Sequence, residues 1–328
     1  MSGADAAGVI GALGARYNGV TSRYARWGTS ATGARILLAH VRLIRPTTRL
    51  WFDGIMPLAV VLVLTRGHAP FRVTVLVIAG LSLIHVALTI VNDLQDVEGD
   101  LRSTEPLRAL RPIARGTISR RVAVVEAIVA GVAGVGLAFA VSWKTGLIAA
   151  ALGAVALEHE LPPVRAQGRP ILGQIAGLAG VAGILAGIAS AVDFEGLTDA
   201  GPYLLFVTVY MGLAEMLVKD IRDVDNDAAG GKITTAVRYG AARAAAIAAA
   251  TYLVTAGLWA WFVHTYSGFR PAAVAVASAI LAVWFVYTAV AARELDRRFS
   301  KTVCISLHAG SILVFTCVNL ATIAAVAR

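Results

Sequence analysis

Long apolar stretches recur along the chain, and short polar or charged segments separate them. An α-helix needs about 20 apolar residues to cross the roughly 30 Å hydrocarbon core of a bilayer. The first and fourth stretches are shorter, and we expect each to extend by about one turn into its flanks. The pattern predicts an all-α integral membrane protein with nine transmembrane helices at residues 50–65, 73–91, 122–142, 145–157, 171–192, 203–218, 244–263, 271–291 and 302–326.

Nine helices would place the segments between them alternately on the two sides of the membrane. Basic residues are unevenly distributed between these two sides. With the amino terminus in the cytoplasm, the cytoplasmic segments hold 24 of the 29 Lys and Arg residues. Because cytoplasmic loops are enriched in Lys and Arg, we predict a cytoplasmic amino terminus in a multi-pass protein of the cell membrane. The opposite segments hold only five basic residues: Arg66, Arg72, Lys144, Arg270 and Arg328.

Composition supports this class of protein. Hydrophobic residues make up 58% of the 328 residues and charged residues 15%, and the mean hydropathy is +0.73. These values exclude a disordered chain, a coiled coil and an ordinary soluble enzyme. The net charge of +9 suits an anionic lipid surface or an anionic substrate and does not choose between them. We expect the bilayer as a partner, and no nucleic acid.

The chain divides into a tail and one domain. Residues 1–40 are rich in Ala, Gly, Ser and Arg and contain no apolar core of signal-peptide length, so we expect a mobile tail. Residues 41–328 form a single transmembrane domain, because no segment between predicted helices exceeds about 30 residues. The two cysteines, Cys304 and Cys317, share one apolar run, which argues against a disulfide framework or a zinc site.

Nine of the 20 acidic residues fall in two short stretches, residues 93–105 and 220–227. The regularly spaced aspartates of these stretches lie in two windows of nine residues each. The windows follow the second and sixth predicted helices and read NDLQDVEGD (92–100) and KDIRDVDND (219–227). Their aspartates match at a constant offset of 127 residues. We interpret the windows as an internal repeat, a feature common in membrane folds. The matched residues are Asp93, Asp96 and Asp100 in the first window and Asp220, Asp223 and Asp227 in the second.

The spacing i, i+3, i+7 spans about 60° of a helix, so each aspartate triplet is expected to share one face. Like charges at such spacings repel, which suggests that cations lie between them. Oxygen ligands without clustered Cys or His favour Mg²⁺ or Mn²⁺ over zinc. Two facing clusters would hold two or more metal ions that bridge a diphosphate. Asn92 and Lys219 occupy equivalent positions, where an amide can complete a metal shell and an ammonium can contact diphosphate oxygens.

With these motifs in place, the chain resembles the UbiA superfamily of intramembrane prenyltransferases. The resemblance covers most of the chain from about residue 41 and rests on NDxxDxxxD, KDxxDxxxD and nine predicted helices. Shorter supporting segments are Arg45-Pro46, RPIARGTIS (111–119), LPPVRAQGRP (161–170) and GKITTAVRYG (231–240). The resemblance implies a ring of nine helices around a central apolar cavity. It also implies Mg²⁺-dependent transfer of a prenyl group from a prenyl diphosphate to a hydrophobic or aromatic acceptor.

Residue roles follow from this chemistry. Loss of diphosphate leaves a carbocation, so the main requirement is stabilisation of the departing negative charge in a site shielded from water. We expect Asp96, Asp223 and Lys219 to be catalytic. Four cations are candidates for binding the diphosphate: Arg111, Arg165, Arg169 and Lys219. The expected metal ligands are Asn92, Asp93, Asp96, Asp100, Asp220, Asp223 and Asp227.

Three further polar residues lie near the expected site. His159 stands where relatives often carry Tyr, and we favour an interfacial role for it over contact with substrate. His85 precedes Asn92 by two helical turns, and ordinary packing is the favoured interpretation. Glu215 lies inside the sixth predicted helix, where an acid is costly, so it is a candidate for supporting the site or for binding the acceptor.

Other functions remain open. A UbiA-type terpene cyclase would keep the metals and use the substrate's own double bond, and aromatic residues around the pocket would favour it. An ion-coupled transporter would place acids near the bilayer centre on broken helices. A CDP-alcohol phosphotransferase needs a motif that the residues after Asp93 do not supply. The sequence does not identify the acceptor, the prenyl length or the carboxylate that would act as base.

Overall fold

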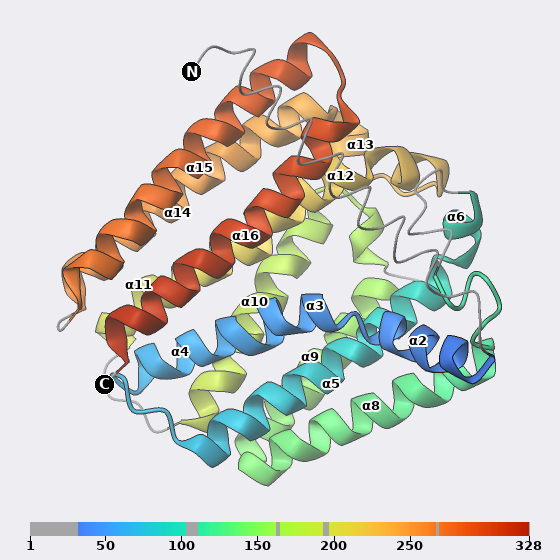
Figure 1. Cartoon of the computed structure of the whole chain (residues 1–328), viewed down its shortest axis with the longest axis horizontal. Coiled ribbons are helices and arrows are strands. Elements are labelled where there is room, and N and C mark those ends of the chain that lie inside the picture. Colours follow the sequence, from blue (N-terminus) through green and yellow to red (C-terminus); the bar gives the residue numbers. More distant parts are fainter. Residues whose placement is uncertain (1–31, 103–110, 162–164, 193–196, 267–268, 328) are drawn as a thin grey trace.

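The computed structural model describes residues 32–102, 111–161, 165–192, 197–266 and 269–327. Every regular element in these ranges is a helix (Figure 1), which confirms the all-α prediction. Residues 1–31 of the predicted tail lie outside the described part of the chain. Residues 32–40 belong to α2 (Thr32–Ile44), which packs Ala39 and Leu43 against the fold. The folded part of the chain therefore begins before the predicted boundary at residue 41.

Six helices are long and apolar enough to cross a membrane, so the chain is a multi-pass membrane protein. Large apolar side chains cover their outer faces, including Val125, Ile128 and Val132 on one helix and Val283 on another. Such surfaces suit contact with lipid. The six helices are α5 (Phe71–Gln95), α8 (Arg120–Val141), α10 (Leu172–Ala191), α14 (Ala241–Thr265), α15 (Pro271–Arg297) and α16 (Lys301–Val326).

The other three predicted spans also fall in helical segments, and the count of nine membrane crossings stays a prediction. One is α9 (Trp143–Glu160), and two are composite. The first composite consists of α3 (Pro46–Arg49), a π-helical turn η1 (Leu50–Ile55) and α4 (Met56–Leu64). The second consists of α11 (Leu197–Val209), a π-helical turn η3 (Tyr210–Glu215) and α12 (Met216–Ala229).

The second composite helix extends well beyond its predicted end at residue 218. Hydropathy falls at Lys219 because the following residues are charged, yet the helix continues to Ala229. Part of this charged extension faces a cavity inside the fold. Apolar patterning alone cannot identify a charged helix of this kind.

The helices pack in two groups. α5 packs along α8, and α8 along α9, whereas α14 packs along α15, and α15 along α16 (Figure 1). α4 contacts α5 in the first group and α16 in the second, whereas α10 contacts α5 and α9 in the first group and packs against η3. An aromatic cluster joins α11, α14 and α16, and its buried rings include Tyr203, Phe206, Phe262 and Phe315. The Tyr203 hydroxyl donates a hydrogen bond of 2.6 Å to Asn319 Oδ1, which satisfies both buried groups.

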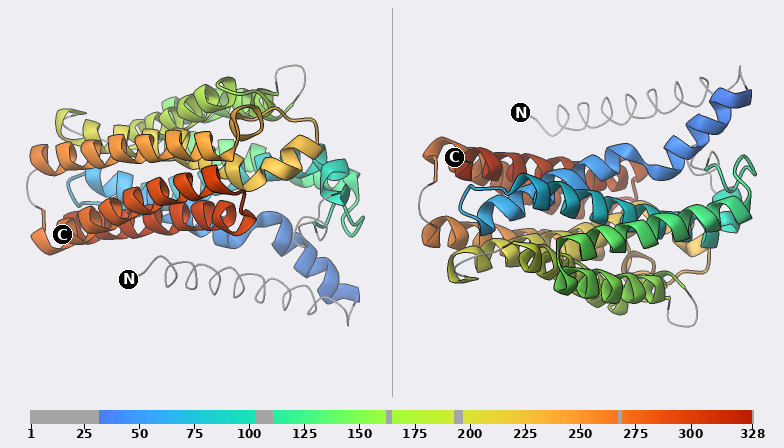
Figure 2. Two further views of the ribbon diagram at one scale, coloured as in Figure 1. Left: turned by 90° about the horizontal axis from the view of Figure 1, so that it is seen from above. Right: turned by 90° about the horizontal axis from the view of Figure 1, so that it is seen from below.

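The long helices run along a common direction, so the fold has two ends (Figure 2). One end carries α2, α6 (Val97–Arg102) and α13 (Thr235–Tyr239), and the other carries the turn between α4 and α5 and the end of α16 (Figure 1). At this second end Tyr266 donates to the Val63 carbonyl over 3.2 Å. Arg66 pairs with Asp199 there as well. The first end is called the polar end below.

Candidate functional site

A cavity of about 550 Å³ lies between the helices. Its walls come from α3 with η1 and α4, from α5, α9 and α10, from η3 with α12, and from α16. None of the described lining residues comes from α14 or α15, so a ring of all nine helices around the cavity remains a prediction. The apolar part of the lining includes Phe52, Met56, Leu76, Val77, Leu81, Ile84, Leu88, Leu152, Val155, Val181, Ile184, Ile188, Met211 and Ile312.

The polar part of the lining gathers residues from both acidic motifs. The first motif contributes Asn92 and Asp96, and all four predicted residues of the second motif line the same cavity. The second set is Lys219, Asp220, Asp223 and Asp227. Two sequence segments about 127 residues apart therefore meet around one space at the polar end.

The first motif does not lie on one continuous helix, contrary to the prediction from its spacing. α5 ends at Gln95, Asp96 is its C-cap with ψ near 2°, and α6 begins at Val97. The break rotates the side chains relative to one another. Asp93 is 2% exposed, and Asp100 is 1% exposed. Neither residue lines the cavity, whereas Asp96 does.

The second motif retains the predicted geometry. α12 is continuous from Met216 to Ala229. Its aspartates at i, i+3 and i+7 therefore share a face, and all three line the cavity. Asp225, which falls between them in sequence, is 57% exposed and pairs with Lys301 over 3.2 Å.

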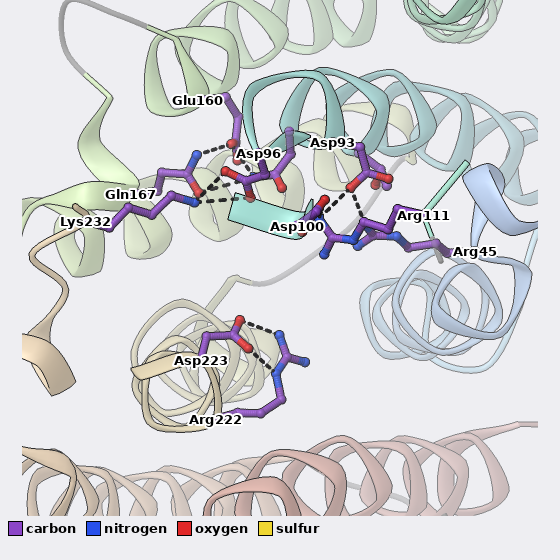
Figure 3. A network of polar contacts seen from close by, with 12 residues as sticks. Arg45, Asp93, Asp96, Asp100, Arg111, Glu160, Gln167, Arg222, Asp223 and Lys232 are labelled. Atoms are coloured by element: carbon purple, nitrogen blue, oxygen red, sulfur yellow. Dashed lines mark hydrogen bonds and ion pairs between the residues drawn. The ribbon is translucent and has the colours of Figure 1, made fainter. Parts of the chain in front are cut away.

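Cations balance the carboxylates of the first motif (Figure 3). Lys232 Nζ lies 2.9 Å from Asp96 Oδ1, and Arg165 lies 3.5 Å from the same oxygen. Arg111 Nη1 lies 3.1 Å from Asp93 Oδ1 and 2.8 Å from Asp100 Oδ2. The first motif thus combines one cavity-facing carboxylate with two that hold Arg111.

Asp93 also pairs with Arg45, the residue that precedes Pro46. On the second motif, the guanidinium of Arg222 contacts both carboxylate oxygens of Asp223, at 2.7 and 2.6 Å. Figure 3 shows this pair across the site from Asp96. Carboxylates paired with basic side chains therefore gather at the polar end of the cavity.

A second polar group lies beside Asn92. The Asn92 amide donates hydrogen bonds to Glu160 Oε2 at 2.6 Å and to Gln167 Oε1 at 3.2 Å. Burial raises the pKa of Glu160, and the nearby Lys219 ammonium acts in the opposite direction. Burial lowers the pKa of His159 to about 4, with Lys219 and Lys232 adding to the effect. The imidazole of His159 is therefore neutral at physiological pH, and it lines the cavity.

Asp220 lies beyond the predicted end of the apolar span at residue 218 and lines the cavity. Burial raises its pKa to about 7, while Lys219 opposes the shift and Asp227 adds to it. Gln174 donates a hydrogen bond of 3.1 Å to Asp220 Oδ2. A divalent cation would stabilise the ionised form of such a carboxylate.

A sequence model of the UbiA prenyltransferase family matches residues 54–322. The chain belongs to the UbiA prenyltransferase family. Three solved structures illustrate the likeness of fold. A UbiA homolog from Archaeoglobus fulgidus, bound to GPP and Mg²⁺, is 19% identical with a TM-score of 0.63, covering 87% of this chain and 99% of its own.

A structure described as digeranylgeranylglyceryl phosphate synthase is 16% identical with a TM-score of 0.62 and covers 88% of this chain and 98% of its own. The apo structure of a UbiA homolog from Aeropyrum pernix K1 is 18% identical with a TM-score of 0.60. The match covers 82% of this chain and 94% of that homolog's chain. A comparison with curated protein sequences gave no match. At these identities the solved structures show a shared fold.

The donor atoms of this UbiA family member fit a hard divalent cation. Within the described part of the chain, no three His, Cys, Asp or Glu side chains converge closely enough to form a metal site by themselves. Mg²⁺ is commonly held by one or two carboxylates, with water and substrate phosphates in its other positions. The cavity supplies the matching oxygen donors: Asn92, Asp96, Asp220, Asp223 and Asp227.

The other predicted cations differ in their placement. Arg111 lines the cavity, and so does Lys219. Arg165 reaches the site through Asp96. Arg169 is exposed and is not among the lining residues.

Several site residues had not been identified from the sequence. Lys232 lies within the GKITTAVRYG segment, but a single Lys in a loop carries no signal for contact with Asp96. Glu160 and Gln167 flank the LPPVR segment, and they belong to no regularly spaced set of polar residues that would mark them in the sequence. Asp53 is fully buried in η1 and pairs with His85 and Arg49. The sequence did offer one indication of Asp53, because an acid inside a predicted membrane span is unusual.

Glu215 was noted as an unusual acid, and the structure supplies its partner. His308 Nδ1 on α16 lies 2.8 Å from Glu215 Oε1. Both residues line the cavity, as do His85 and Arg49. The cavity wall therefore carries the Glu215–His308 pair and His85, whose partner Asp53 is buried behind it.

Proposed function

We propose that the protein catalyses Mg²⁺-dependent transfer of a prenyl group from a prenyl diphosphate to an acceptor, with an aromatic acceptor as the favoured class. The observation that carries this proposal is the meeting of both acidic motifs around one end of an apolar cavity. Charged groups there suit a diphosphate, and the apolar walls suit an isoprenoid chain. Solved structures of a family member bound to GPP or DMAPP with Mg²⁺ support the same pairing of ligands.

The proposed metal ligands are the cavity-facing donors Asn92, Asp96, Asp220, Asp223 and Asp227. Bound Mg²⁺ would neutralise charge that develops on the departing diphosphate. Asp93 and Asp100 were also predicted as ligands, and through Arg111 they orient a cation toward the same site. Lys219, Lys232, Arg111 and Arg165 would contact the diphosphate, and the predicted contact of Arg169 requires its exposed side chain to turn inward.

The apolar walls would hold the prenyl chain and exclude water. Exclusion matters because a carbocation that meets water is hydrolysed. Leu81, Leu152 and Ile184 come from three different helices and line this region. The acceptor would enter the same space, close to C1 of the prenyl group.

Transfer to an acceptor is favoured over cyclisation by the chemistry of the walls. A cyclase would benefit from aromatic rings that stabilise successive carbocations. Among the described lining residues, Phe52 is the only Phe, Tyr or Trp. Most of the large rings pack instead in the cluster of α11, α14 and α16.

The orientation of the site is part of the proposal. We propose nine crossings, a cytoplasmic amino terminus and a polar end that opens toward the cytoplasm of a cell-membrane protein. A transporter would also use buried acids and broken helices, as found at Asp53 and Glu215. Membership of a prenyltransferase family favours the enzyme.

The decisive experiment incubates the purified protein and Mg²⁺ with geranyl, farnesyl or geranylgeranyl diphosphate. Parallel reactions contain a panel of phenolic acceptors, a glycerophosphate lipid or no acceptor. We expect an acceptor-dependent prenylated product that disappears on chelation of the metal. A cyclic hydrocarbon formed without acceptor would assign a cyclase, and failure to consume any prenyl diphosphate would overturn the proposal.

A further inference from the structure

The Glu215–His308 pair is an ionisable pair that the proposed binding of diphosphate does not use. Glu215 is 5% exposed. Its Oε1 lies 2.8 Å from His308 Nδ1, and the buried Oε2 has no hydrogen-bond partner among the described residues. Burying such a pair inside a membrane fold is costly. An unsatisfied carboxylate oxygen on a cavity wall therefore calls for a ligand or a proton-transfer role.

The surroundings hold this pair in place. Ser311 lies one turn after His308 on α16 and accepts two hydrogen bonds from buried tyrosines. Tyr210 donates to the Ser311 carbonyl over 2.9 Å, and Tyr252 donates to the Ser311 hydroxyl over 2.6 Å. These bonds tie α16 to η3 and α14 at the level of the imidazole. The part of α16 that carries His308 is therefore held against η3 and α14.

The depth of the pair matches the expected position of the reacting atoms. Glu215 precedes Asp220 by five residues and Asp223 by eight on the same composite helix. A rise of 1.5 Å per residue places it roughly 8 to 12 Å deeper than these carboxylates. A diphosphate bound at the carboxylates would direct C1 of the prenyl group toward this depth, and an acceptor would lie beside it.

We propose that His308, with Glu215 as its positioning partner, accepts the proton that the acceptor loses during prenyl transfer. This inference rests on the proposed function. The C1–O bond breaks with its electron pair remaining on diphosphate, and a carbon of the aromatic acceptor bonds to C1. The proton on that carbon then passes to the imidazole, and the C–H electron pair restores the aromatic ring. Glu215 stabilises the resulting imidazolium until the proton is released to water.

The other histidine–carboxylate pair is less suited to this role. Asp53, the partner of His85, also pairs with Arg49 over 3.0 Å. That arginine already compensates the carboxylate. Glu215 has no Arg or Lys ion-pair partner among the described residues, so its charge is available to an imidazolium.

The test compares Glu215→Gln and His308→Gln with the matched control Glu126→Gln. Glu126 pairs with His40 over 2.7 Å, is about one-third exposed and does not line the cavity. Each variant is assayed for kcat with geranyl diphosphate, Mg²⁺ and a phenolic acceptor on which the wild-type protein acts. Direct binding of geranyl diphosphate with Mg²⁺ and the kinetic isotope effect of a ring-deuterated acceptor are measured in parallel.

We expect kcat to fall about 10²-fold or more in both cavity variants, with unchanged affinity for geranyl diphosphate. An isotope effect should appear in these variants because removal of the ring proton becomes slow. The control should behave as wild type. Wild-type kcat in the cavity variants would overturn the proposal and leave the proposed function intact.

A second outcome would also overturn the proposal that His308 accepts the proton. If the variants lose kcat together with affinity for geranyl diphosphate, or without any isotope effect, the pair serves binding or folding instead. If the wild-type protein forms no acceptor-dependent product, the proposed function fails and this inference fails with it.

Discussion

Asp96 and Asp223 occupy equivalent positions in the two motifs, and both face the cavity. They differ in local structure, because Asp96 caps a helix and Asp223 lies within one. Both carboxylates are close to cations, Lys232 in one case and Arg222 in the other. Under the proposed function, each carboxylate would exchange that partner for a metal ion, and the freed cation would contact the diphosphate.

We predict that Asp96→Asn or Asp223→Asn lowers kcat by about 10²-fold or more, because an amide provides less charge to hold the metal. The matched control is Asp225→Asn, which changes an exposed carboxylate on the same helix that does not line the cavity. Turnover of prenyl diphosphate is measured for all three variants, with size-exclusion profiles to show that they remain folded. Full activity in either cavity variant would remove that residue from the metal site.

Lys232 supports a second prediction at this scale. Its Nζ lies 2.9 Å from Asp96, and its side chain is 12% exposed. We expect Lys232→Met to weaken binding of prenyl diphosphate with Mg²⁺ by roughly tenfold or more, since a charged hydrogen bond contributes about 1.5–3 kcal/mol. Titration calorimetry measures the change.

Arg298→Met is the control for this prediction, because Arg298 is 76% exposed and pairs with Glu294 at the surface. Surface ion pairs of this kind contribute little to stability. Unchanged affinity in Lys232→Met would mean that the ammonium only balances Asp96 in the free protein.

The sequence could identify the aspartates because they repeat in register. The same reasoning could not find Lys232, Glu160 or Gln167, whose contacts join loops to helices far apart in the chain. No spacing rule connects Asn92 to Glu160, and only the folded helices bring them within 2.6 Å. Charged repeats were therefore predictable, and their single counter-ions were not.

At the scale of elements, identical spacing gave two different structures. The second triplet lies on the continuous α12, whereas the first is divided between α5 and α6 at Asp96. The hydrophobic periodicity predicted helices on both sides of the first motif but could not locate the break. As a result, Asp93 and Asp100 contact Arg111 and do not share one face with Asp96, as they would on a straight helix.

The two π-helical turns were also beyond a pattern-based prediction. η1 and η3 lie inside apolar spans, and each carries a buried acid that faces a histidine. A π-helical turn changes the angular position of the residues that follow it, and such turns are frequent at functional sites. Local sequence encodes this adjustment only weakly.

Gly212 permits η3 to approach α10 closely and provides a third prediction. An ideal Cβ at this position would lie 2.7 Å from Leu178 Cα and 2.9 Å from Leu178 N. Backbone atoms cannot move aside without shifting a helix, so we expect Gly212→Ala to lower the free energy of unfolding by about 1–3 kcal/mol. Unfolding in mixed detergent micelles measures this change.

Gly136→Ala is the matched control, because a Cβ at Gly136 in α8 meets no atom within 4 Å. Alanine has the higher helix propensity, so this variant should be as stable as the wild type or slightly more stable. Equal stability of the two variants would show that η3 and α10 separate easily.

At the scale of the whole molecule, the described chain enters at the polar end with α2 and leaves at the opposite end after α16 (Figure 1). Entry and exit at opposite ends fit an odd number of crossings. Hydropathy and charge bias predicted this general organisation. The cavity was expected only through the resemblance to a family, because no property of a single helix reports the space between several helices.

The last prediction concerns the orientation of the whole molecule. Single cysteines are introduced as Thr117→Cys at the polar end and His68→Cys at the opposite end, in a background with Cys304→Ala and Cys317→Ala. Both chosen positions are exposed. Because 24 of the 29 basic residues fall in segments predicted to be cytoplasmic, we expect a membrane-impermeant maleimide to label only the His68 position in intact cells. Labelling at the Thr117 position should require permeabilised cells. The reverse pattern would place the polar end outside the cytoplasm, where the prenyl diphosphate would have to be supplied from the other side of the membrane.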